Sequence, residues 1–172
     1  MKYLFIYEHL DLGGIETLIV RMCNWLVKND HDVILYLERG GVLEELLDSK
    51  VTTIIKGKQF KYIFNPQKIS HIINNVSIDC LYTFGPKASF IGGSIYSSLD
   101  NKNSINFFSG IYHPKEFNIY GKFTLRSIFQ SNFFKKYLKL DTQVFMSKEV
   151  KLGIEDSMKF GFENSIIWPL AI

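Results

Sequence analysis

Short apolar runs recur along the chain and alternate with stretches in which apolar residues return every three or four positions. The first run, Lys2–Glu8, is almost continuously apolar, which is typical of a parallel strand buried on both faces. After a polar turn at His9–Gly14, apolar side chains recur at helical spacing up to about Asn29. The alternation continues to the end of the chain. We expect about seven strands, at Lys2–Glu8, Asp32–Glu38, Val51–Lys56, Ile78–Phe84, Ser104–Ser109, Thr142–Ser147 and Ser165–Trp168.

Helices are expected between most of these strands. Gly41–Lys50 is predicted to be a short helix and Gly57–Phe64 a loop. Asn65 and Pro66 form a favourable helix start, because asparagine caps free backbone amides and proline suits the first turn. The helix that begins there is predicted to run to about Val76. Further helices are predicted over Pro86–Leu99, Lys122–Leu140 and Lys148–Phe160.

The order of these elements predicts the fold class. Strands that alternate with helices form β-α-β units and a mostly parallel sheet. Right-handed connections then place helices on both faces of the sheet. The sequence contains no internal repeat and no low-complexity linker. We therefore expect residues 1–172 to form a single α/β domain with a doubly wound, Rossmann-like sheet, whose ligands bind beyond the carboxyl ends of the strands.

Composition narrows the possible partners and compartments. Of 172 residues, 47% are hydrophobic and 15% aromatic, which excludes the profile of a disordered chain. The net charge of +3 is too small and too dispersed to indicate a nucleic-acid partner. Cys23 and Cys80 lie in apolar segments, which predicts buried free thiols and a reducing compartment. No signal-like segment follows Met1, and no apolar run approaches the ~20 residues that span a bilayer. We expect a cytoplasmic protein that is at most peripheral to a membrane.

Gly13 and Gly14 occupy the turn before the first predicted helix. A nicotinamide or flavin site needs the spacing G-x-G-x-x-G, with an acid about 20 residues later. Here Glu38 lies where such an acid belongs, but the spaced glycines are missing, and the P-loop pattern is absent too. Two residues without Cβ at a helix N-terminus still let backbone amides approach an anion. The pair is thus either an anion-facing loop or a tight turn, with Glu16 a helix-start residue.

Four features in a fixed order resemble family-four glycosyltransferases of the GT-B fold. The sequence from Lys2 to Val33 has the strand, the Gly-Gly turn, a Glu two residues later and a His-x-Val entry to the second strand. Asp30 stands where that family has a glycine. The other three features follow later in the chain. They are His113 in "FFSGIYHP", Ser147 in "VFMSKE" and Pro169 in "IIWPLAI".

The resemblance implies transfer of a sugar from a nucleotide-sugar donor to a glycan or lipid-linked acceptor, usually with retention and without a metal. It implies that this chain is the N-terminal, acceptor-side half, and that the donor-binding C-terminal domain, which holds a Glu-x7-Glu element, is absent. We therefore expect no activity from this chain alone. Glu8 and Glu16 have the same spacing, but they bracket the first loop, so we take the match as coincidence. The loop with Gly13 and Gly14 would face the donor phosphates.

The loops after the first, fourth, fifth and sixth strands carry the candidate site residues. His113 is the candidate catalytic residue, because Pro114 stiffens its loop and an imidazole there can bond a sugar hydroxyl or steady developing charge. A loop histidine without a role is the alternative, and His31 and His71 are expected to be structural or solvent-facing. No nucleophilic triad, metal cluster or paired carboxylates are apparent, and no cofactor is expected. The candidate acceptor contacts are His9, Asp11, Tyr82, Thr83, Lys87, Ser147 and Lys148. Asp11 is equally explained as a turn residue, and Ser147 as the N-cap of the next helix.

The segment Lys115–Lys139 is basic and rich in aromatic residues. A basic amphipathic helix of this kind can lie in an anionic membrane interface. An ordinary surface helix whose phenylalanines pack on the sheet is the alternative. The candidate membrane contacts are Lys122, Arg126, Lys135, Lys136 and Lys139.

Two other functions stay open at this point. One is a non-enzymatic Rossmann-like module that binds a membrane or a protein partner through the basic segment. The other is a fragment of a nucleotide-cofactor oxidoreductase. A composition rich in Lys, Asn and Ile suggests a bacterial protein, and polysaccharide biosynthesis would fit the leading hypothesis.

Overall fold

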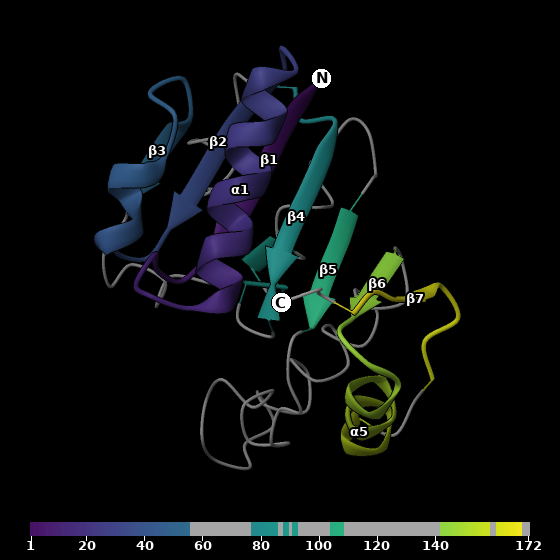
Figure 1. Ribbon diagram of the computed structural model, residues 1–172. Helices are drawn as coiled ribbons and strands as arrows, with labels where there is room; N and C mark the ends of the chain where they lie inside the picture. The colour runs from purple at the N-terminus through teal and green to yellow at the C-terminus, as the bar shows by residue number, and fades with distance from the viewer. Residues whose placement is uncertain are drawn as a thin grey trace, which may run out of the picture.

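A parallel sheet runs through the whole domain (Figure 1). The computed structural model describes residues 1–55, 77–85, 88–89, 91–92, 104–108, 142–158 and 161–169. Neighbouring strands pair in parallel in the order β3-β2-β1-β4-β5-β6-β7. The expected α/β fold with a parallel sheet is therefore confirmed. The strands are β1 Lys2–Tyr7, β2 Asp32–Leu37, β3 Thr52–Ile55, β4 Cys80–Phe84, β5 Ser104–Phe108, β6 Thr142–Phe145 and β7 Ser165–Ile167.

Three helical elements are described in full: α1 Gly14–Lys28, the short η1 Val42–Leu46 and α5 Lys148–Met158. The helix predicted up to Asn29 is confirmed as α1. The helix predicted over Gly41–Lys50 is shorter, a single 3-10 stretch. Glu44 accepts a hydrogen bond from the Gly41 N–H at 2.6 Å, and extended backbone at Leu47 ends the stretch. The helices predicted over 65–76 and 122–140, and most of 86–99, lie outside the described residues.

Strand β1 is buried on both faces, as its continuous apolar run predicts. Leu4, Phe5 and Ile6 have no exposed surface. On one face Phe5 packs against α1, in a core cluster that also includes residues of β2 and β4. Burial of each such side chain contributes about 1.5–3 kcal/mol. The helical residues of this core are Ile19, Val20, Cys23, Leu26 and Val27.

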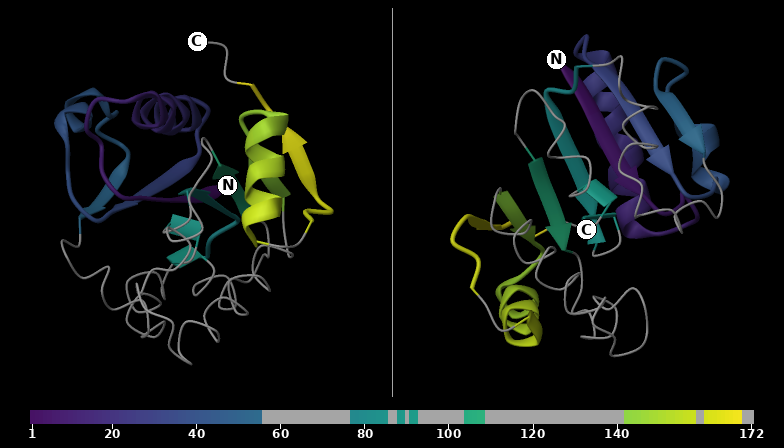
Figure 2. Two further views of the ribbon diagram at one scale, coloured as in Figure 1. Left: turned by 90° about the horizontal axis from the view of Figure 1, so that it is seen from below. Right: turned by 180° about the vertical axis from the view of Figure 1, so that it is seen from behind.

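Described residues of the connections that follow β4 and β6 pack on the opposite face of the sheet. Thr83 and Ser89 place their hydroxyl oxygens 3.0 Å apart in the core. A Cβ on Gly92 would lie 2.5 Å from the Thr83 methyl group, so this helical stretch packs directly on β4. Further along the sheet the rings of Phe145 and Phe162 are 5.0 Å apart. Figure 2 shows the same layers from below and from behind.

Both cysteines are buried free thiols, as expected. Burial raises the pKa of the Cys23 thiol to about 12, so it stays protonated and unreactive at neutral pH. Among the residues that the structure describes, no helix is long and apolar enough to cross a membrane.

Candidate functional site

Two neighbouring loops at the carboxyl edge of the sheet form the candidate site. One follows β1 and leads into α1, and the other follows β2 and leads into η1 (Figure 1). The backbone N–H groups of Glu38 and Arg39 both donate to the Glu8 carbonyl, at 3.1 and 3.0 Å. The Leu43 N–H donates to the Leu10 carbonyl at 2.9 Å. These bonds hold the loops together as one unit.

Gly41 makes this close approach possible. A Cβ at position 41 would lie 2.1 Å from the Leu10 carbonyl carbon and 2.5 Å from the Asp11 nitrogen. The backbone at Gly41 is extended, a conformation open to any residue, so space and not backbone strain requires the glycine. Leu10 is fully buried beneath the contact and anchors the first loop to the core.

Five polar side chains meet on these loops and form what we call the β1-edge cluster: Tyr7, His9, Asp11, Glu16 and Arg39. The Asp11 carboxylate pairs with the Arg39 guanidinium and lies 3.4 Å from His9 Nδ1. His9 Nδ1 lies 3.7 Å from Glu16 Oε1. The Tyr7 hydroxyl donates to that same Glu16 oxygen at 2.8 Å. A continuous chain of polar contacts therefore joins β1, the start of α1 and the end of β2.

The ion pair between Asp11 and Arg39 fixes the charge of Asp11 in the cluster. The hydrogen bond from Arg39 holds the pKa of Asp11 below its ordinary value, and the nearby positive charge acts in the same direction. The same hydrogen bond raises the pKa of Arg39. Asp11 is therefore an anion throughout the neutral range. Next to it, the His9 side chain keeps 29% of its surface exposed and can reach a ligand.

The glycine turn is partly filled by the protein itself. Gly13 caps α1 with extended backbone, and a Cβ there would lie 2.1 Å from Glu16 Oε2. Glu16 is only 8% exposed, so its carboxylate is held over the helix N-terminus, where the helix dipole favours negative charge. A Cβ on Gly14 would meet no atom within 4 Å. The space that a side chain would fill is therefore open at Gly14, whereas at Gly13 it is occupied by Glu16.

Tyr82 and Thr83 do not join the β1-edge cluster. Side chains alternate along a strand, so the two residues lie on opposite faces of β4. The Thr83 side chain is fully buried against Ser89 and has no surface for a ligand. The Tyr82 ring stacks on Phe5, with centroids 4.8 Å apart, on the face that α1 covers. Sequence proximity to the end of β4 was therefore a poor guide to which side chains reach the edge.

Ser147 and Lys148 lie at the carboxyl edge, at the junction of β6 and α5. The Ser147 hydroxyl accepts a hydrogen bond from the Val150 N–H at 3.2 Å, so it caps the helix. Lys148 is exposed. Three strand spacings, roughly 14 Å, separate β6 from β1. A ligand that touches both places must extend along the edge of the sheet.

The remaining candidates lie outside the described residues, and their roles stay predictions. His31 is described; it precedes β2 at the opposite edge, with its ring 5.4 Å from that of Tyr3. Within the described part of the chain, no three His, Cys, Asp or Glu side chains are grouped as metal ligands. The undescribed candidates are Lys87, His113, Lys122, Arg126, Lys135, Lys136 and Lys139.

Sequence reasoning missed the contributions of Tyr7, Glu16 and Arg39 to the site. Glu16 is more than a helix-start residue, because it links Tyr7 to His9. Arg39 is 28 positions from its partner Asp11. A signal was available: polar residues that directly follow two adjacent parallel strands meet at one edge of the sheet.

Comparison with known proteins identifies the fold. No protein-family model matches the sequence, and no curated protein matches it. Solved structures do. A glycosyltransferase from Rickettsia africae superposes with a TM-score of 0.66 at 17% identity, over 96% of this chain and 42% of its own. Anabaena HepE, in complex with UDP and glucose, superposes with a TM-score of 0.65 at 13% identity, over 97% of this chain and 44% of its own. Sucrose-phosphate synthase from Thermosynechococcus elongatus superposes with a TM-score of 0.64 at 11% identity, over 99% of this chain and 48% of its own.

These similarities establish a glycosyltransferase-like fold. The chain spans less than half the length of each of these three structures, whereas almost all of it is matched. The chain therefore matches only a part of each of these longer proteins.

Replacing Arg39 with Ala should raise the pKa of Asp11, because the hydrogen bond that stabilises the carboxylate is lost. The pKa of Asp11 is lower in the folded protein than in the unfolded chain, where it is ~3.9. The Asp11–Arg39 pair therefore stabilises the fold at pH values above ~3.9, and this stabilisation is lost as the pH falls through the folded-state pKa. Carboxyl-detected NMR titration measures the shift. Arg21→Ala, at another exposed arginine, is the control. An Asp11 pKa that is the same in wild type and Arg39→Ala would contradict the assignment.

Gly41→Ala should destabilise the domain by about 1–3 kcal/mol, since backbone atoms of Leu10 and Asp11 have to move. Gly14→Ala is the matched control, because a Cβ there meets no neighbour. Urea unfolding of both variants gives the comparison. Equal stability of Gly41→Ala and wild type would show that the two loops are not packed as described.

Proposed function

We propose that this chain is the N-terminal, acceptor-side half of a glycosyltransferase. The enzyme would transfer a sugar from a nucleotide-sugar to a glycan or a lipid-linked acceptor. The observation that carries the proposal is the match of 96–99% of this chain to 42–48% of three glycosyltransferase-like structures. The donor would bind mainly to the other half, so this half alone would be inactive. Retention of anomeric configuration, as in the family-four enzymes that the sequence resembles, is part of the proposal.

The β1-edge cluster would bind the acceptor. Sugar hydroxyls both donate and accept hydrogen bonds, and the cluster offers both kinds of partner within a few ångströms. Asp11, kept ionised by Arg39, is an acceptor, and the exposed part of His9 is a second polar contact. Because the Asp11–Arg39 pair joins two loops that are already bonded, little ordering is needed when a ligand binds.

The donor phosphates would approach at Gly14, at the N-terminus of α1, where a side chain is missing and free backbone amides favour an anion. Glu16 would keep the phosphates from the Gly13 side by charge repulsion. His113 would supply an imidazole near the transferred sugar, and Lys87, Ser147 and Lys148 would extend acceptor contacts along the edge. No metal or cofactor is part of the proposed reaction. The enzyme would act in the cytoplasm, with the basic segment on an anionic membrane.

His113→Ala in the full-length enzyme should lower turnover of the nucleotide-sugar by more than about tenfold, because a positioned imidazole contributes ~10²–10⁴-fold in such steps. Product formation is measured with saturating donor, and circular dichroism checks folding. His31→Ala, at the opposite edge of the sheet, is the control. If turnover survives in His113→Ala, the histidine has no catalytic role.

Replacing Lys135, Lys136 and Lys139 together with Glu should abolish sedimentation with phosphatidylserine vesicles at low salt, since each basic residue near an anionic surface contributes about 1 kcal/mol. Lys28→Glu combined with Lys50→Glu alters exposed lysines elsewhere and serves as the control. Wild-type protein that stays in the supernatant would refute membrane contact.

A further inference from the structure

His9 lies at the centre of the β1-edge cluster, and three side chains contact its ring. The Tyr7 ring lies beside it, with ring centroids 5.8 Å apart and ring planes tilted by 50°. Asp11 Oδ2 lies 3.4 Å from His9 Nδ1, and Glu16 Oε1 lies 3.7 Å from the same nitrogen. Both carboxylates therefore approach one nitrogen of the imidazole and not the other.

Glu16 is held in place independently of His9. Its side chain is buried, and the Tyr7 hydroxyl donates at 2.8 Å to Glu16 Oε1, the oxygen that faces His9. Glu16 also belongs to the first turn of the 15-residue helix α1, where the helix dipole favours its negative charge. The position of this carboxylate is therefore fixed by β1 and α1, and not by the loop that carries His9.

Two kinds of group compete at His9 Nδ1. The Asp11 N–H points to this nitrogen at 3.5 Å and favours a form without a proton there. The carboxylates of Asp11 and Glu16 favour a proton, because an anion attracts an N–H and repels a lone pair. Contacts with charged partners are roughly twice as strong as those between neutral groups, so the two carboxylates outweigh the single amide. This geometry favours the neutral imidazole with its proton on Nδ1.

A proton on Nδ1 determines what the ring offers to a ligand. The neutral imidazole carries one N–H, so Nε2 then accepts a hydrogen bond. The neighbouring Asp11 carboxylate also accepts, and both side chains are partly exposed. A group that binds to the two of them has to donate, as a sugar hydroxyl does and an ionised phosphate does not.

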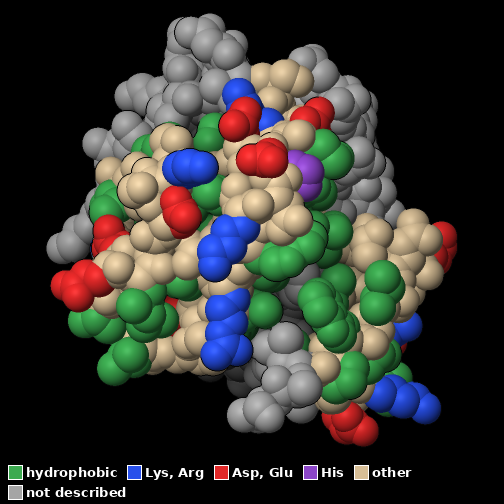
Figure 3. All heavy atoms as spheres, turned by 45° about the horizontal axis from the view of Figure 1, so that its top comes forward, with side chains coloured by type: hydrophobic (Ala, Val, Ile, Leu, Met, Phe, Trp, Pro, Cys, Tyr) green, Lys and Arg blue, Asp and Glu red, His purple; other side chains and the backbone are tan. Residues whose placement is uncertain are grey.

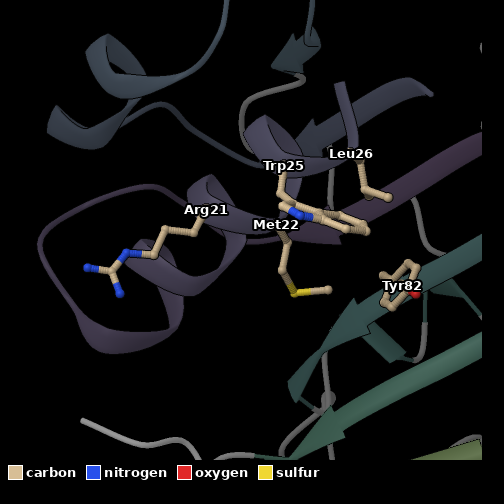
Figure 4. Close-up of a pocket in the computed structure, with 5 residues that line it drawn as sticks. All are labelled: Arg21, Met22, Trp25, Leu26 and Tyr82. Carbon is tan, nitrogen blue, oxygen red and sulfur yellow. The ribbon is translucent and has the colours of Figure 1, made fainter. Parts of the chain in front are cut away.

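Two other described residues that could have supplied such a contact lie elsewhere. His31 directly precedes β2, at the amino end of the sheet that Figure 3 turns toward the viewer. The Tyr82 ring lies in apolar surroundings beside Met22 and Trp25 of α1 (Figure 4). Among the histidines that the structure describes, His9 is therefore the one at the carboxyl edge.

We infer that Glu16, together with Asp11, is a positioning residue for His9: the two carboxylates hold the imidazole with its proton on Nδ1, and Nε2 accepts a hydrogen bond from a hydroxyl of the sugar acceptor. The inference deepens the proposed function and rests on it for the identity of the ligand. The arrangement of the ring is a property of the 172-residue chain itself. Tyr7 contributes indirectly, because its hydroxyl holds Glu16.

Nitrogen NMR of the imidazole rings tests this arrangement, because couplings to the ring protons distinguish the Nδ1–H form from the Nε2–H form. At alkaline pH, where imidazole is neutral, His9 in the 172-residue chain should be in the Nδ1–H form. Glu16→Gln should shift the ratio of the two forms at least about threefold toward Nε2–H, since a neutral amide attracts the proton less than a carboxylate. Tyr7→Phe, which conserves the shape of the ring, should shift the ratio in the same direction.

Glu45→Gln, at an exposed acid on η1, is the matched control for these variants. It should leave the His9 signals unchanged, and the His31 signals should be the same in every variant. An Nε2–H form of His9 in the wild-type chain overturns the inference. So does a ratio of the two forms that is the same in wild type and Glu16→Gln.

Substitutions of His9 in the full-length enzyme test the contact at Nε2. A glutamine places a polar group near the position of Nε2, whereas an asparagine reaches only as far as Nδ1. The KM for the sugar acceptor should therefore rise at least about threefold more in His9→Asn than in His9→Gln, because one hydrogen bond to the ligand is lost. Equal KM values in the two variants overturn the contact.

The two experiments separate this inference from the proposed function. Sugar transfer by the full-length protein with His9 in the Nε2–H form rejects the inference alone. The Nδ1–H form in a protein that transfers no sugar rejects the proposed function and the ligand contact, and leaves the positioning of His9 by Glu16 and Asp11 standing.

Discussion

The pairing of β1 with β2 on one side and β4 on the other is the constraint on which the rest of the structure depends. Its register aligns Tyr7 with Leu37 and Ile6 with Thr83. The chain that leaves β1 therefore emerges beside the chain that leaves β2. The strand order reverses at β1, so the connections that follow β1 and β4 run to opposite faces of the sheet. The crevice between such connections lies at the carboxyl edge of the sheet, where ligands bind in folds of this kind.

The β1-edge cluster is a direct consequence of that register. Leu10 is buried, Gly41 lets the second loop lie against it, and Asp11 then meets Arg39 at the surface. Each step depends on the one before. The polar groups are largely satisfied by one another, so the loops are ordered before any ligand arrives. Loops that are ordered in this way suit the acceptor-binding role proposed for this half.

Much of the fold could be predicted from the sequence because its signals are local. The apolar run at Lys2–Tyr7 and the helical spacing within α1 indicate their structures without tertiary information. The helix expected at Gly41–Lys50 is shorter than predicted for a local reason as well, since the backbone becomes extended at Leu47. Boundaries elsewhere agree with the predictions to within one or two residues for the described strands.

The candidate site was only partly predictable. His9, Asp11, Gly13 and Gly14 were found because they follow β1 directly. Arg39 was not, because its pairing with Asp11 depends on which strands are neighbours.

The central proposal is that this domain is half of an enzyme that uses a nucleotide-sugar. The most direct test incubates the full-length protein with a panel of nucleotide-sugars and glycan or lipid-linked acceptors, and follows the products by mass spectrometry. We expect one donor to be consumed, with release of its nucleotide and a matching gain of mass in an acceptor. No consumption of any donor, together with binding of a nicotinamide or flavin cofactor, would contradict the account.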